Sequence, residues 1–273
     1  MPASDPTDRF MVVDGLRLHY LERGDARGRP LILLHGLSSH AHAWDDLAAA
    51  LAPYFWTLAL DQRGHGQSAW ADRYDAEAYV ADLEGFADAL GLESMALVGH
   101  SLGGRHAIIF AARHPQQVER LAIVDFGPEV MAEGVARMRQ AAQTVPEAFA
   151  DPEEAVALMV AESPNVDPAA IRRRTLHNLR RLPDGRWAWR FDPVLRQVGG
   201  GASPNLWPLL AHIPCPVLVV RGEESDLLAP EVAAAMAQAL PLGQLVTVAG
   251  AGHRVPLEQP AAFARALLGF LGR

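Results

Sequence analysis

The pattern of apolar and polar positions along the chain predicts strands that alternate with helices. Unbroken apolar runs, such as residues 31–34 and 95–98, are typical of strands that are covered on both faces. Amphipathic stretches lie between such runs; residues 76–90, for example, place Val80 and Leu83 on one face of a helix. Strands that alternate with helices in this way predict an α/β fold, with a mostly parallel sheet and helices on both sides.

Residues 129–212 interrupt this alternation. They contain several helical patterns and a turn at Pro183-Asp184-Gly185, but no apolar run of the kind expected for a buried strand. We therefore expect residues 129–212 to form a helical cap, inserted into an α/β core that consists of residues 1–128 and 213–273. The chain of 273 residues is long enough for one large core with such an insertion.

Composition and charge narrow the classes of partner and location. The net charge of −8 argues against nucleic acid and an anionic membrane surface as partners, and no apolar run approaches the length of a membrane span. The N-terminal residues lack a basic region followed by an apolar run, so no signal peptide is predicted. Cys215 is the only cysteine and is expected to be a packed thiol. We expect a cytoplasmic monomer or homodimer that uses no cofactor or metal ion.

The stretch Gly99-His100-Ser101-Leu102-Gly103 has the strongest chemical signal. This Gly-x-Ser-x-Gly pattern follows a predicted buried strand and precedes a predicted helix at residues 102–113, which is the setting of a nucleophile elbow. A sharp turn there lifts the serine hydroxyl clear of the backbone, and the two glycines prevent collisions. The start of the helix directs N–H groups and a partial positive charge towards a developing oxyanion. Ser101 is therefore the candidate nucleophile.

Three further motifs accompany the elbow, namely His35-Gly36, Asp61-Gln-Arg-Gly-His-Gly-Gln-Ser68 and Gly252-His253. Each motif is weak alone, but together and in this order they resemble the α/β-hydrolase superfamily. The resemblance covers nearly the whole chain outside the predicted cap. It implies an eight-stranded, mostly parallel sheet and a Ser-His-acid triad, but the fold alone implies no substrate.

His253 is the candidate base of the triad. It follows the last predicted core strand in a glycine-rich loop, which can bring the imidazole back over the edge of the sheet, and it has the place along the chain that the triad order requires. Of the other histidines, His35 is expected to be loop scaffold, His65 to belong to a turn, and His100 to flank the nucleophile and point elsewhere. The expected surface or rim residues are His40, His42, His114 and His177.

The oxyanion hole requires two backbone N–H groups. Leu102 supplies one because it directly follows the nucleophile, and Leu37 is expected to supply the other from the loop after His35-Gly36. Asp61 and Arg63 could be mistaken for catalytic groups, but the glycine-rich motif around them favours a structural turn.

The position of the acid is open between two aspartates. In the superfamily the acid normally follows the strand that corresponds to residues 216–220, in the pattern Gly-x-x-Asp. Here Ser225 occupies that position and Asp226 lies one residue later, a shift that turns a side chain away. Asp125 ends the apolar run at residues 121–124, and an aspartate at that edge of the sheet is also placed to reach the base.

Some members of the superfamily, including a group of small bacterial esterases, have their acid after this earlier strand. In those esterases a serine at the usual acid position joins the triad as a fourth member. The stretches Val124-Asp125-Phe126-Gly127-Pro128-Glu129 and Arg221-Gly222-Glu223-Glu224-Ser225 resemble that group. The resemblance implies Asp125 as the acid, with Asp226 as the alternative. It also implies a hydrogen bond from Ser225 to the acid or the imidazole, for which the alternative is a plain turn serine.

Two groups of side chains concern the substrate. Trp187, Trp189 and Phe191 are expected to pack the cap onto the core, with lining of the substrate pocket as the alternative, and the same two interpretations apply to Trp44. The run Arg172-Arg173-Arg174, together with Arg180 and Arg181, is expected to be a solvated helix face, with attraction of anionic substrates towards the cap as the alternative.

Together these residues predict a serine hydrolase that cleaves small or medium-sized carboxylic esters through an acyl-enzyme on Ser101. The alternatives are a hydrolase of carbon–carbon bonds or lactones with the same triad, and a non-catalytic receptor for a small ligand. Haloalkane dehalogenase and epoxide hydrolase activities are disfavoured, because both require an aspartate at the position of Ser101.

Overall fold

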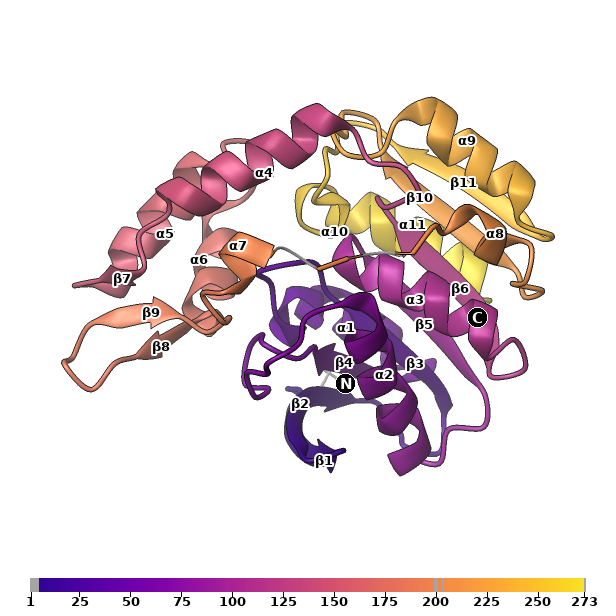
Figure 1. The fold of residues 1–273 in the computed structure, drawn as a ribbon, viewed down its shortest axis with the longest axis horizontal. Coiled ribbons are helices and arrows are strands. Elements are labelled where there is room, and N and C mark those ends of the chain that lie inside the picture. Colours follow the sequence, from indigo (N-terminus) through magenta and orange to yellow (C-terminus); the bar gives the residue numbers. More distant parts are fainter. Residues whose placement is uncertain (1–4, 199–200, 203, 273) are drawn as a thin grey trace.

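The computed structural model describes residues 5–198, 201–202 and 204–272, and an eight-stranded sheet forms its centre (Figure 1). The strand order is β1-β2-β4-β3-β5-β6-β10-β11. β1 and β2 form an antiparallel hairpin and β2 pairs antiparallel with β4, whereas all other neighbours are parallel. The α/β-hydrolase fold predicted from the sequence is confirmed. The strands are β1 (Thr7–Val13), β2 (Leu16–Arg23), β3 (Arg29–Leu34), β4 (Phe55–Asp61), β5 (Met95–His100), β6 (Val118–Val124), β10 (Val217–Gly222) and β11 (Gly243–Val248).

Helices cover both faces of the sheet because alternate residues of each central strand point to opposite sides. Ile32 and Leu34 of β3 belong to one apolar cluster, and Leu31 and Leu33 belong to the other. The first face packs against α2 (Ala76–Ala89), α3 (Leu102–Arg113), α8 (Trp207–Leu210) and α9 (Pro230–Ala239). The second face packs against the short helix η1 (Ala41–Trp44), α1 (Asp45–Leu51), α10 (Val255–Glu258) and α11 (Pro260–Leu271).

The cap lies between β6 and β10 in the chain and arches over one end of the sheet (Figure 1). Its helices are α4 (Ala132–Thr144), α5 (Pro152–Ala161), α6 (Pro168–His177) and α7 (Leu195–Val198). It also contains an antiparallel sheet that the sequence did not predict, in the order β7 (Ala148–Phe149), β9 (Trp187–Trp189) and β8 (Leu179–Arg181). These strands are two or three residues long, which is too short to give an apolar run.

The C-terminal part of the predicted insertion packs with the core and not with the cap. Leu206 and Leu210, which fall inside the predicted cap, belong to the main core cluster together with Ile213. The cap proper therefore ends before α8. Where the cap meets the core, Leu102 packs in a separate apolar cluster that includes Trp189. This contact places the cap directly beside the residue that follows Ser101.

Two further expectations concern Cys215 and the membrane. Cys215 is buried in the main core cluster, and burial raises the pKa of its thiol to about 11, as expected for a packed and unreactive side chain. Within the described part of the chain, none of the helices combines the length and the apolar character that a bilayer span requires.

Candidate active site

Ser101 lies at the tip of a sharp turn between β5 and α3. Its backbone has φ 52° and ψ −117°, in the left-handed half of the map that residues with a side chain rarely adopt. The flanking glycines make this turn possible. A Cβ atom on Gly99 would lie 2.3 Å from the carbonyl oxygen of Gly103, and one on Gly103 would lie 2.3 Å from the carbonyl oxygen of Leu34. The strand and the helix can approach this closely only without side chains at both positions.

A chain of hydrogen bonds joins Ser101, His253 and Asp125. Nε2 of His253 lies 3.0 Å from Oγ of Ser101, and Nδ1 of the same ring lies 2.8 Å from Oδ2 of Asp125. Because the carboxylate only accepts, Nδ1–H donates to it, which leaves Nε2 to accept from the serine hydroxyl. Asp125 is completely buried at the end of β6, and His253 lies on the loop after β11. The structure thus brings these three residues together across more than half of the chain.

Ser225 contacts the same carboxylate. Its hydroxyl donates to Oδ2 of Asp125 at 2.5 Å, and the backbone N–H of Gly222 donates to Oδ1 at 2.9 Å. Oγ of Ser225 in turn accepts from the backbone N–H groups of Leu227 and Leu228, at 3.2 and 3.1 Å. The serine at the usual acid position is therefore a buried link between the Asp125 carboxylate and the following loop, not a plain turn residue.

Asp226 points away from the imidazole. Its carboxylate forms a two-pronged ion pair with Arg137 of α4, in which Nη2 lies 2.9 Å from Oδ1. The hydrogen bond from Arg137 holds the pKa of Asp226 below its usual value. Within the described residues, Asp226 makes no hydrogen bond to His253. The alternative acid therefore joins the core to the cap.

Replacing Ser225 by alanine is expected to lower the free energy of unfolding by about 1–3 kcal/mol, because the buried N–H groups of Leu227 and Leu228 lose their acceptor. Urea denaturation measures the change. Ser94→Ala is the matched control; it removes a partly exposed hydroxyl that donates to Glu119 at the surface, and it should change stability by less than about 0.5 kcal/mol. An equal effect of both substitutions would contradict a structural role for Ser225.

The loop after β3 lies directly against the nucleophile. A Cβ atom on Gly36 would be 3.2 Å from Cβ of Ser101. Leu37, the next residue, lines a cavity together with Ser101 and Leu102. The backbone N–H groups of Leu37 and Leu102 have no hydrogen-bond partner among the described residues, which leaves them available to a ligand. This is the arrangement that an oxyanion hole requires.

Two neutral histidines hold this loop in place. Nδ1–H of His35 donates to the carbonyl of Gly36 at 2.8 Å, and Nε2 accepts from the backbone N–H of Gln62. Nε2 of His65 accepts from the backbone N–H of Ser38 at 3.0 Å, where φ is 59°. Burial lowers the pKa of His65 to about 3 and lowers that of His35 as well, so both rings stay neutral and can accept. Both therefore act as loop scaffold, as the sequence suggested.

Asp61 anchors the same region from the end of β4. Its carboxylate accepts from the backbone N–H of Ala41 at 2.6 Å and of Gln67 at 2.8 Å, and lies 2.7 Å from Nδ1 of His19. Burial alone would raise the pKa of Asp61, but the hydrogen bond and charge of His19 outweigh it and lower the pKa to about 2. All of these contacts are structural, and none reaches Ser101.

Two residues that support His253 could hardly be identified from the sequence. Nε2–H of His100 donates to the backbone carbonyl of His253 at 2.8 Å, which fixes the loop that holds the imidazole. The carboxylate of Glu258 accepts from the backbone N–H of Gly252, directly before the base. We had expected His100 only to point away, and Glu258 lies five residues after the base without any motif around it.

One histidine assignment was wrong. His40, expected at the surface or the rim, is only 3% exposed and lies under the cap helix α6. The loop before η1 turns inwards at this point, and the apolar and polar pattern of a loop does not indicate such a turn. Burial lowers the pKa of His40 well below its usual value, so the ring is neutral.

A cavity of about 730 Å³ between cap and core contains Ser101 and His253. Trp44 and Trp189 line it, and each also packs in an apolar cluster, so their role in binding a substrate stays a prediction. A second cavity of about 510 Å³ also reaches Ser101 and extends along α4 and α7. Trp187 lines neither cavity; it pairs with Phe149 in the small sheet and packs against the apolar cluster that includes Leu102. Volumes of this size suit a small organic molecule.

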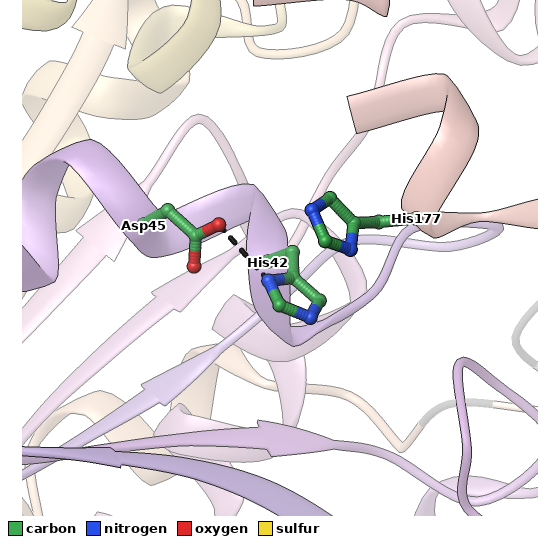
Figure 2. Close-up of side chains that lie close together, drawn as sticks. All are labelled: His42, Asp45 and His177. Atoms are coloured by element: carbon green, nitrogen blue, oxygen red, sulfur yellow. Dashed lines mark hydrogen bonds and ion pairs between the residues drawn. The ribbon is translucent and has the colours of Figure 1, made fainter. Parts of the chain in front are cut away.

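Three side chains of metal-binding types, His42, Asp45 and His177, meet where η1 approaches the end of α6 (Figure 2). Nδ1 of His42 lies 2.9 Å from Asp45 Oδ2, and the two imidazoles stack with 3.7 Å between centroids and 19° between planes. A metal ion lies in the plane of each ring that binds it, about 2 Å from the nitrogen. Nearly parallel stacked planes do not meet at such a point. In this arrangement the cluster is a contact between core and cap, and the absence of a metal requirement stays a prediction.

Comparison with known proteins identifies the family of the chain. The sequence model of the alpha/beta hydrolase family matches residues 31–266. The chain belongs to this family. Among other members, it is 29% identical over 274 residues to 2-(acetamidomethylene)succinate hydrolase of Mesorhizobium japonicum, with 99% of each chain covered. It is 32% identical over 249 residues to the esterase Rv0045c of Mycobacterium tuberculosis, covering 88% of this chain and 82% of the relative.

A solved structure shows the same similarity. The crystal structure of E-2-(acetamidomethylene)succinate hydrolase superimposes with a TM-score of 0.90 at 28% identity, covering 97% of this chain and 99% of the other. These members of the alpha/beta hydrolase family are hydrolases, and the present chain is an enzyme of the same class. The names of these relatives agree in the class of reaction, which is hydrolysis, but differ in the substrate.

Proposed function

We propose that the protein is a serine hydrolase that cleaves carboxylic esters with small or medium acyl groups through an acyl-enzyme on Ser101. The observation that supports this most strongly is the chain of hydrogen bonds from Ser101 through His253 to the buried Asp125, at 3.0 and 2.8 Å. A nucleophile, a base and an orienting acid within hydrogen-bond distance are the parts that acyl transfer requires. The cavity above them has room for a small ester.

In the first half of the proposed reaction, Nε2 of His253 takes the hydroxyl proton of Ser101 while Oγ attacks the ester carbonyl. The carbonyl oxygen becomes an oxyanion, which the N–H groups of Leu37 and Leu102 stabilise by hydrogen bonds. The tetrahedral intermediate collapses, the bond to the alcohol oxygen breaks, and the imidazolium gives its proton to that oxygen. The products of this half are the free alcohol and an acyl group on Ser101.

In the second half, a water molecule takes the place of the alcohol. Nε2 of His253 removes a proton from the water, and the resulting hydroxide attacks the acyl carbonyl. The intermediate collapses with return of the proton to Oγ of Ser101, which releases the carboxylic acid. Asp125 orients the imidazole and stabilises its cation in both halves, and Ser225 and the Gly222 N–H hold Asp125 in position.

A panel of p-nitrophenyl esters tests this proposal. We expect hydrolysis of the acetate and butyrate with kcat/KM of about 10⁴ M⁻¹s⁻¹ or more, in the usual range for an enzyme, and slower turnover of the laurate, whose chain is long for the cavity. Release of p-nitrophenol measures the rate. If the protein cleaves none of these esters above the uncatalysed rate, the proposal is wrong, and a ligand-binding role becomes the better interpretation.

A further inference from the structure

One end of the cavity contains buried hydrogen-bond donors that have no partner. Nε1 of Trp44 and Nδ1 of His40 are both buried without a hydrogen bond in the described part of the protein, and the two residues are 2% and 3% exposed. Both line the cavity that contains Ser101; His40 directly precedes η1 and Trp44 is its last residue. Buried polar atoms are nearly always paired in proteins, so an unpaired set in a cavity is expected to meet its partner in a ligand.

Arg174 of α6 lines the same end of the cavity. Among the described residues, its guanidinium has neither an ion pair nor a hydrogen bond. Burial lowers the pKa of its guanidinium to about 10, at which it is still charged at neutral pH. His40 and His100 line the same cavity, and the charge of Arg174 adds to the effect of burial in lowering the pKa of both imidazoles.

The neighbouring arginines behave differently. Arg172 forms an exposed ion pair with Glu153, and Arg173 lies 3.6 Å from Asp46 on the surface. The solvated helix face expected for this run therefore applies to these two residues and not to Arg174. Successive helical residues are rotated by about 100°, so the third arginine faces the cavity while the first two face outwards.

The acidic residues that line the cavity do not supply the missing partner. Asp226 is held by Arg137, and Glu258 is 3.5 Å from Arg254. Two others, Glu162 and Glu224, are exposed at the rim. The unpaired acceptor Oδ1 of Asn178 also lines the cavity, but it cannot bind an anion and is not part of the set of donors.

We propose that Arg174, Trp44 and His40 form a subsite for a carboxylate of the substrate, so that the preferred substrates are esters that carry a second, free carboxylate. A carboxylate offers two coplanar oxygens that can accept from the guanidinium, from the indole N–H and from the N–H of a neutral imidazole. A phosphate dianion would need more than the one unpaired cation that this cavity supplies. The inference rests on the proposed ester hydrolysis and specifies its substrate class.

The test compares half-esters with matched neutral diesters, namely monoethyl glutarate with diethyl glutarate and monoethyl succinate with diethyl succinate. We expect the wild-type protein to favour the half-esters in kcat/KM. In Arg174→Met the ratio of half-ester to diester should fall by about tenfold to a hundredfold, the effect of losing a charged hydrogen bond. Trp44→Phe keeps the ring but removes the donor, and should lower the ratio by about threefold to tenfold.

Arg173→Met is the matched control, because it removes an equal charge one residue away on the outer face of α6, and the ratio should not change. The proposal is overturned if wild type shows no preference for half-esters, or if Arg173→Met and Arg174→Met change the ratio equally. An equal drop in both substrates with Arg174→Met would likewise overturn it, because that result indicates a general effect on the site.

A binding measurement separates this inference from the proposed reaction. Calorimetry with glutarate and the full-length Ser101→Ala protein should show binding that weakens by about tenfold or more when Arg174→Met is added. If no ester is hydrolysed but this result is obtained, the proposed reaction is wrong and the subsite is supported. If glutarate does not bind, or binds equally in both proteins, the subsite is wrong. Tighter binding of inorganic phosphate than of glutarate would overturn its assignment to carboxylates.

Discussion

Replacing Ser101 by alanine is expected to lower kcat/KM for p-nitrophenyl butyrate by about 10⁴-fold or more. The substitution removes Oγ, the atom that forms the acyl-enzyme, which lies 3.0 Å from Nε2 of His253. Among the described residues, no other hydroxyl is hydrogen-bonded to this nitrogen. The amides of Leu37 and Leu102 remain, so a small residual rate over water is expected from the oxyanion hole alone. Release of p-nitrophenol at saturating and sub-saturating ester measures kcat and KM.

The fold provides the control for this experiment. Alanine meets no larger steric conflict than serine at φ 52°, and the backbone N–H of residue 101 still donates to the carbonyl of Val124 at 2.9 Å. The midpoint of urea denaturation should therefore change little. If Ser101→Ala keeps more than about a tenth of the wild-type activity while the protein is folded, Ser101 is not the nucleophile.

The second large effect concerns the acid. Asp125→Asn is expected to lower kcat/KM by about 10³-fold or more. The amide must keep an oxygen towards the N–H of Gly222, so its NH₂ group faces His253 and donates to Nδ1. The proton of the neutral imidazole then moves to Nε2, which can no longer accept the proton of Ser101. The buried imidazolium also loses the negative charge that stabilises it.

Asp226→Asn is the matched comparison, because it neutralises the adjacent candidate acid on the same loop. Its ion pair with Arg137 is partly exposed, so we expect a change of less than about threefold in kcat/KM and less than about 1 kcal/mol in stability. Parallel ester assays and denaturation curves compare the two variants. A larger loss of activity in Asp226→Asn than in Asp125→Asn would show that the acid is assigned to the wrong residue.

The inner strands of the central sheet could be predicted from the sequence because they are apolar on both faces. Short unbroken apolar runs such as residues 31–34 are typical of strands that are buried on both faces. The small sheet of the cap could not be predicted in this way, since strands of two or three residues have no measurable period. The boundary of the cap was also placed too late, because Leu206 and Leu210 give the same apolar signal whether they pack on the cap or on the core.

The candidate site, too, could be predicted only in part. Ser101 and His253 could be found from local motifs, since each motif contains the glycines that its backbone requires. The choice between Asp125 and Asp226 depends on the direction of two loops, which the sequence does not specify. In the structure φ of Asp125 is 49°, a conformation that turns its carboxylate towards His253, whereas Asp226 faces α4.

The residues around the cavity were the least predictable. Three consecutive arginines look alike in sequence, and only the position of α6 on the core determines that Arg174 faces inwards. His40 was misjudged for a similar reason, because a loop does not indicate whether its side chains will be covered by a distant segment. Here the cap covers His40.

The proposed acyl-enzyme on Ser101 is tested most directly by trapping it. Paraoxon transfers a diethylphosphoryl group to an activated serine and releases p-nitrophenol, so intact-mass spectrometry of the full chain, followed by peptide mapping, locates the modified residue. The account predicts one adduct per chain, on Ser101, with loss of esterase activity in the same proportion, and no adduct in Ser101→Ala. An adduct on another residue that abolishes activity, or an active enzyme that paraoxon does not modify, would contradict it.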